Sequence, residues 1–159
     1  MNNKEAIKNV GLSFALLGSL LLGTGCSQPS EPSEDSTGGH YHAAPHGGSL
    51  VMLGNHIAQL ELVPGERSGE WIFYILDGGA ERFVRIEQEA IEVTMDGKEA
   101  VFQATANSAT GETVGDTAQF MAKVEGLSGK SRFPVRIDEI VVLRQPFSQV
   151  EFNFPEGKH

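Results

Sequence analysis

The sequence predicts an all-β fold, an antiparallel β-sandwich or small barrel of about eight short strands with at most short helices. Two observations carry this prediction. From Leu50 onward, short runs rich in β-branched and aromatic residues alternate with turn dipeptides, about every 8–12 residues. In addition, no stretch of about 12 or more residues shows the 3.6-residue apolar period of an amphipathic helix.

The first strands follow from alternation and from turn residues. Residues 56–63 (HIAQLELV) alternate, with leucines on one face and Gln59 and Glu61 on the other. Residues 71–76 (WIFYIL) are apolar on both faces, as in a central strand that is covered on both sides. Asp77-Gly78-Gly79 is expected to supply positive-φ turn residues, so that residues 82–86 return as the second strand of a hairpin.

A second hairpin joins residues 91–95 to residues 100–105 through Asp96-Gly97, the dipeptide typical of a type I′ turn. Further strands are predicted at residues 118–124, 133–137, 140–143 and 150–154. The expected core consists of Trp71, Phe73, Ile75, Val93, Phe102, Phe120, Phe152 and Phe154.

The N-terminus has the pattern of a processed export signal. Lys4 and Lys8 form a positive n-region, and residues 10–22 form an uncharged h-region that is too short to span a bilayer. The small residues of 23–25 then precede Cys26, the only cysteine in the sequence. A single cysteine excludes a disulfide framework and a CxxC metal or redox site.

This apolar run, with its small residues and cysteine, resembles the lipobox of bacterial lipoproteins. The resemblance implies cleavage before Cys26 and a lipid thioether on its sulfur. Ser27, in place of Asp, then implies retention at the outer membrane of a Gram-negative cell envelope, on its periplasmic side or at its surface. Ordinary secretion with a free thiol, or a short buried helix, are the alternatives.

The predicted organisation has three parts: a lipoprotein signal peptide (1–25), a lipidated cysteine with a disordered, histidine-bearing tether (26–43), and a β-sandwich domain (44–157). Residues 27–39 contain no apolar side chain that could offset the entropy of ordering. Removal of residues 1–25 changes the net charge from -9 to -10. That negative charge opposes contact with anionic lipid and with nucleic acid. The acyl chains alone are therefore expected to attach the protein to the membrane.

Four of the five histidines lie within residues 40–56. Imidazole is a common ligand of Cu and Zn, and His40 and His42 point the same way in an extended segment. With His46, which Pro45 and Gly47-Gly48 position, they form a candidate metal site for Cu or Zn. His56 is expected to be a structural histidine, and solvated histidines without a metal role are the alternative for the other three.

Enzyme chemistry is not expected. The sequence contains neither a GxSxG nucleophile elbow nor a phosphate-binding glycine-rich loop. Its carboxylates at positions 87, 89, 92 and 99 alternate with apolar residues, as on solvated strand faces. One Trp and two Tyr offer few of the stacking aromatics that a glycosidase cleft uses.

Several segments are similar to small bacterial lipoproteins of unassigned function, and to an HGG-containing β-region in the periplasmic adaptor subunits of heavy-metal efflux pumps. The matching segments are residues 44–48 (APHGG), 53–54, 56–62, 74–77, 84–86 and 152–157. The similarity implies a β-sandwich-like domain and a link to metal traffic, with His46 as the residue that matches a metal contact. The long helical hairpin of a true adaptor is absent from the sequence.

Two functions are therefore expected. The first is a non-enzymatic, membrane-anchored metal-binding accessory protein that works beside an efflux or metal-homeostasis system. The second is an envelope interaction module that docks an envelope or efflux protein, with no metal role.

Overall fold

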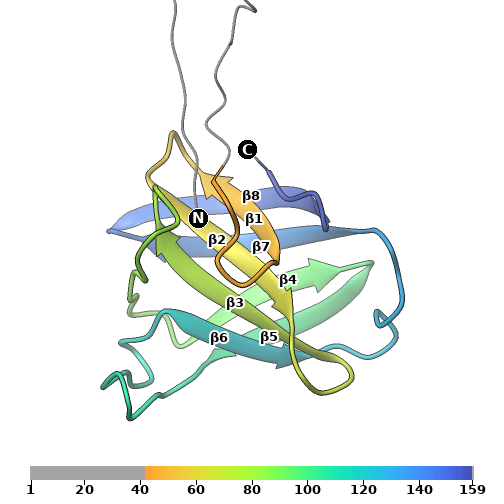
Figure 1. The fold of residues 1–159 in the computed structure, drawn as a ribbon, viewed down its shortest axis with the longest axis horizontal. Coiled ribbons are helices and arrows are strands. Elements are labelled where there is room, and N and C mark those ends of the chain that lie inside the picture. The colour runs from red at the N-terminus through yellow and green to blue at the C-terminus, as the bar shows by residue number, and fades with distance from the viewer. Residues whose placement is uncertain (1–41, 159) are drawn as a thin grey trace, which may run out of the picture. The chain divides into compact units, whose positions relative to one another are not determined.

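The computed structural model describes residues 42–158 as one antiparallel sheet of eight strands that curls into a nearly closed barrel, without a helix (Figure 1). This confirms the all-β prediction in its barrel form. The signal peptide (1–25) and most of the tether (26–41) lie outside the described residues. The strands are β1 (Ser49–Leu53), β2 (Ala58–Pro64), β3 (Glu70–Asp77), β4 (Ala90–Met95), β5 (Lys98–Ala104), β6 (Gln119–Lys123), β7 (Phe133–Val142) and β8 (Gln145–Phe154).

The sheet order is β1-β2-β3-β6-β5-β4-β7-β8. Its two outer strands approach each other, and the C-terminal tail fills part of the seam between them (Figure 1). Lys158 makes two backbone hydrogen bonds to β1. Its N–H donates to Leu50 O (3.0 Å), and its carbonyl oxygen accepts from Met52 N (2.6 Å). Gly157 is required in this tail because a Cβ there would overlap the carbonyl oxygen of Leu50.

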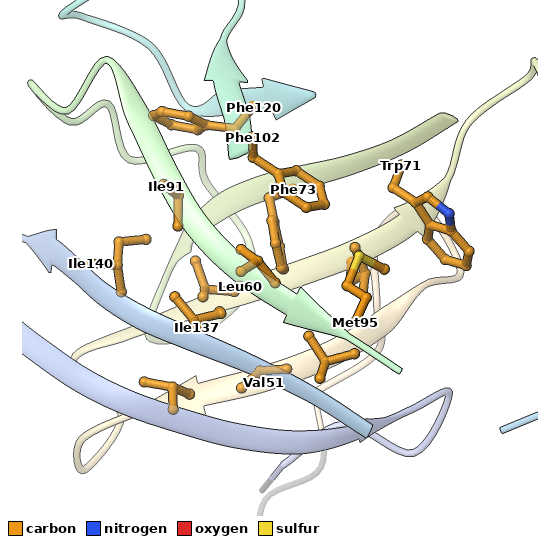
Figure 2. Packing of buried hydrophobic residues seen from close by; sticks show 14 of the residues in the cluster. Val51, Leu60, Trp71, Phe73, Ile91, Met95, Phe102, Phe120, Ile137 and Ile140 are labelled. Atoms are coloured by element: carbon orange, nitrogen blue, oxygen red, sulfur yellow. The ribbon is translucent and has the colours of Figure 1, made fainter. Parts of the chain in front are cut away.

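The barrel interior is filled by apolar side chains from all eight strands. Figure 2 shows Phe73, Phe102 and Phe120 in this core, and the centroids of the Phe73 and Phe102 rings are 4.6 Å apart. Seven of the eight residues of the expected core belong to this cluster, and the eighth, Phe154, is partly buried and packs against it.

The Asp96-Gly97 turn is confirmed: both residues have positive φ, 52° and 76°, as a type I′ turn requires. The other predicted turn differs, because the positive φ falls on Ala80 and on neither Gly78 nor Gly79. Glycine is needed at position 78 for a different reason. The backbone there lies so close to His56 that a Cβ would overlap its carbonyl oxygen.

The prediction of a return strand at residues 82–86 is wrong. Strand β6 occupies the edge of β3 as far as the Tyr74–Gln119 pair, so only the last residues of β3 remain open to a partner. The segment makes a single bridge to β3, Leu76 to Phe83, and Ile86 then bridges Thr117 instead of continuing along β3. Residues 133–137 and 140–143, predicted as two strands, form the single strand β7 because no turn interrupts them.

Candidate functional site

Residues 42–48, the described part of the histidine-bearing segment, lie over the outer face of β1, β2 and β3. Ala44 packs against a small apolar cluster of Leu50, Leu76 and Ala80, outside the barrel core. The segment then turns, with Gly47 N donating to Ala44 O at 3.1 Å. Because this layer covers the sheet, β2 is buried on both faces over its first five residues.

The centre of this layer is Glu61, whose side chain is fully buried on the outward face of β2. One carboxylate oxygen, Oε1, accepts hydrogen bonds from His46 N (2.8 Å) and Gly48 N (2.9 Å). The other oxygen, Oε2, lies 2.7 Å from His46 Nδ1. A buried carboxylate is costly unless it is hydrogen-bonded, so Glu61 ties residues 46–48 to the sheet.

The two glycines of the HGG sequence make this attachment possible. Gly47 has a φ of 71°, in the left-handed region that glycine adopts readily. A Cβ on Gly48 would lie 2.5 Å from the carbonyl oxygen of Leu62, so only glycine brings this backbone close enough to β2. Gly47 and Gly48 therefore do more than position His46, because they belong to the hydrogen-bonded site around Glu61.

The His46 ring is held in one orientation. It stacks on Tyr74 with a centroid separation of 4.0 Å and an interplanar angle of 17°, and it lies 5.9 Å from the exposed ring of Phe83. With Nδ1 bound to Glu61, Nε2 is the ring nitrogen left for another partner, and 34% of the side chain is exposed. Carboxylates orient metal-binding histidines in this way, through the nitrogen that does not bind the metal.

The pKa of Tyr74 is raised above its ordinary value of 10.0, first by burial and second by the negative charge of Glu61. Both causes disfavour the phenolate. The folded protein therefore retains the phenolic proton above pH 10, where the unfolded chain loses it, and the stability from this group decreases as pH rises through that range.

Glu61→Gln removes the charge and is expected to move the pKa of Tyr74 back toward 10. Ultraviolet titration of the phenolate measures this shift, with Tyr74→Phe identifying the signal because Tyr41 is the other tyrosine. Glu92→Gln, a change at an exposed position on β4, is the control. A Tyr74 titration that is identical in the wild type and in Glu61→Gln contradicts the proximity of an ionised Glu61.

His42 lies beside His56, in the turn that precedes β2. The two ring centroids are 5.7 Å apart at an interplanar angle of 80°. His56 was expected to be structural, at the start of a strand. It lies instead in the exposed turn between β1 and β2, with a φ of 57°, because β2 begins only at Ala58.

The expected metal residues thus fall in different places. His46 is bound to Glu61, His42 faces His56, and His40 and the lipidation site Cys26 lie outside the described residues. Within residues 42–158, no three side chains of His, Cys, Asp or Glu are grouped closely enough to hold a metal ion. In that range there is also no helix of sufficient length and hydrophobicity to cross a bilayer.

A hollow of about 470 Å³ adjoins the stacked ring of His46. Its lining is both apolar and polar, and Arg67 in this lining has no ion-pair partner among the described residues. The principal lining residues are His46, Val63, Arg67, Ile72, Tyr74 and Met121.

Comparison with protein-family models, with curated proteins and with solved structures gives no match to this chain.

Proposed function

We propose that this protein is a lipid-anchored, extracytoplasmic and non-enzymatic accessory protein that binds Cu or Zn and acts beside a metal efflux or homeostasis system. Cys26 carries the lipid, and His40, His42 and His46 supply the imidazoles. The support comes from the export and lipobox pattern of residues 1–26 and from the placement of the histidine-bearing segment on the barrel.

The observation that carries the metal function is the contact between His46 and Glu61. A buried carboxylate fixes the ring through Nδ1 and through the His46 backbone N–H. Fixing the segment reduces the conformational entropy that an ion must overcome when it gathers ligands from a flexible chain. A solvated, incidental histidine does not need such an anchor.

The metal function predicts that Cu or Zn raises the melting temperature of the soluble mature chain, in which Cys26→Ala prevents lipidation. At an ion concentration of about 100 times Kd, the expected stabilisation is about 2.7 kcal/mol. The His40→Ala/His42→Ala/His46→Ala variant is expected to lose this response, as followed by calorimetry and thermal unfolding. Identical unfolding of the wild type with and without each ion would reject the metal function.

Lipid attachment at Cys26 is tested separately, in cells. Incorporation of labelled palmitate into the wild type, and its loss together with membrane association in Cys26→Ala, is the expected result. A Cys26→Ala protein that still sediments with membranes contradicts lipid attachment at this position.

A second candidate function, an envelope interaction module without a metal role, is favoured by Phe83. This aromatic side chain is 58% exposed, and its ring centroid lies 5.9 Å from that of Tyr74. Exposed aromatic anchors beside a hollow are typical of protein-binding surfaces. Crosslinking of an envelope protein in the wild type that is lost in Phe83→Ala, while the response to metal ions is absent, would favour this function over the first.

A further inference from the structure

We infer that His56 is a metal ligand and that His42 and His56 together form a two-imidazole centre for Cu(I). This inference rests on the proposed metal-binding function and names the residues that meet at the ion. His46, through its contact with Glu61, also anchors the segment that carries His42.

The separation of the two rings fits a shared ion. Since metal–imidazole bonds are about 2.0–2.1 Å long, an ion lies about 3.2 Å from each ring centroid, so two rings on one ion have centroids about 5 Å apart at a tetrahedral angle and about 6.5 Å apart when linear. The centroids of His42 and His56 are 5.7 Å apart, between these limits. No change in the backbone is needed to bring the rings to that distance.

The rings meet edge to face, so one of them must turn about its Cβ–Cγ bond to aim a nitrogen at the ion. The torsional wells of histidine χ2 are broad, and His56 is exposed while His42 is only half-buried. Neither ring has a hydrogen bond to another described residue that this rotation would break. His46 differs in its contacts, because Glu61 and Tyr74 both restrain its ring.

Both partners are held by the fold. His56 has a φ of 57°, and its carbonyl oxygen lies against Gly78, where a Cβ would overlap it. His42 leads into Ala44, which is packed on Leu50 and Leu76. The β1–β2 turn and the anchored segment therefore present one imidazole each at the same end of the outer layer.

The number of ligands selects the ion. A structural zinc site almost always has four protein ligands, whereas Cu(I), a d¹⁰ monovalent ion, is satisfied by two or three donors. The described residues supply two imidazoles here, without a third acidic, thiol or imidazole group in range. The two imidazoles are enough for Cu(I), whereas Zn would need further ligands from outside the described residues.

The test is Cu(I) binding by the mature chain with Cys26→Ala, in competition with a chromophoric Cu(I) chelator under anaerobic conditions. His42→Ala and His56→Gly are each expected to weaken Cu(I) binding at least tenfold. Glycine is used at position 56 because it adopts the positive φ without strain, so the turn is retained. Glu92→Gln, at an exposed position on β4, is the control, and its affinity is expected to stay within threefold of the wild type.

The outcomes separate the inference from the function on which it rests. If the wild type binds neither Cu(I) nor Zn, both the metal-binding function and the His42–His56 centre are rejected. Binding that is lost in the triple variant at positions 40, 42 and 46 but unchanged in His56→Gly retains the function and overturns the inference. Tighter binding of Zn than of Cu(I) overturns the choice of ion.

Discussion

Replacement of Glu61 by leucine is expected to destabilise the domain by about 2–4 kcal/mol and to release the histidine-bearing segment from the sheet. Three donors lose their acceptor in this variant: the backbone N–H groups of His46 and Gly48 and the Nδ1–H of His46. A buried donor without an acceptor costs about 1–3 kcal/mol, so the segment avoids that cost by leaving the sheet and hydrogen-bonding to water. Urea unfolding measures the change in stability.

Two further variants identify the cause. Glu92→Leu makes the same substitution at an exposed position on β4 and is expected to change the unfolding free energy by less than about 0.5 kcal/mol. Glu61→Gln retains an oxygen for the two backbone donors and is expected to fall between Glu61→Leu and the wild type. Equal stability of Glu61→Leu and Glu92→Leu would show that the segment is not attached through this carboxylate.

Phe73→Ala is expected to have the largest effect on stability, a loss of about 3–5 kcal/mol. Phe73 is fully buried on the central strand β3, pairs with Phe120 on β6 and contacts the ring of Phe102. Its truncation removes apolar burial and leaves a cavity that a closed ring of strands cannot easily collapse. A fall in the urea midpoint with an unchanged slope is the expected measurement.

Val101→Ala is the matched control for the core. Val101 lies on β5, and its side chain is 48% exposed, so its truncation is expected to change stability by less than about 1 kcal/mol. Comparable losses from the two variants would contradict the assignment of Phe73 to the interior of the barrel.

The fold class could be predicted because alternation and turn chemistry are local. The Asp96-Gly97 hairpin, for example, depends on a dipeptide whose residues both tolerate positive φ. The conformation of residues 82–86 could not be predicted in this way. It depends on β6, which lies more than 30 residues further along the chain and occupies the edge of β3. Competition between strands for one edge is a property of the topology.

The candidate site was only partly visible in the sequence. The APHGG run and the histidines indicated the segment that contacts Glu61, but Glu61 itself was placed on the polar face of an alternating strand. Alternation does not reveal that a second layer covers this face and converts a solvent-facing carboxylate into a buried acceptor. The signal that could have found it is the pairing of a close-approach glycine motif with an acidic residue on the next strand.

The pairing of His42 with His56 was missed for a similar reason. Fourteen positions separate the two residues, and their proximity depends on where β1 ends and on a histidine in a left-handed turn conformation. The sequence placed His56 inside a strand, on the parity of Leu60 and Leu62. The two-residue difference in the start of β2 moves the ring from the barrel end to the outer layer.

The central claim is that a buried carboxylate fastens the histidine-bearing segment to the barrel, and amide hydrogen exchange of His46 and Gly48 tests it most directly. Both N–H groups donate to Glu61 Oε1, at 2.8 and 2.9 Å. We predict exchange at these two amides as slow as in the paired strands β2 and β3, and fast exchange in Glu61→Leu. Exchange in the wild type at the rate of an unstructured peptide would contradict the account.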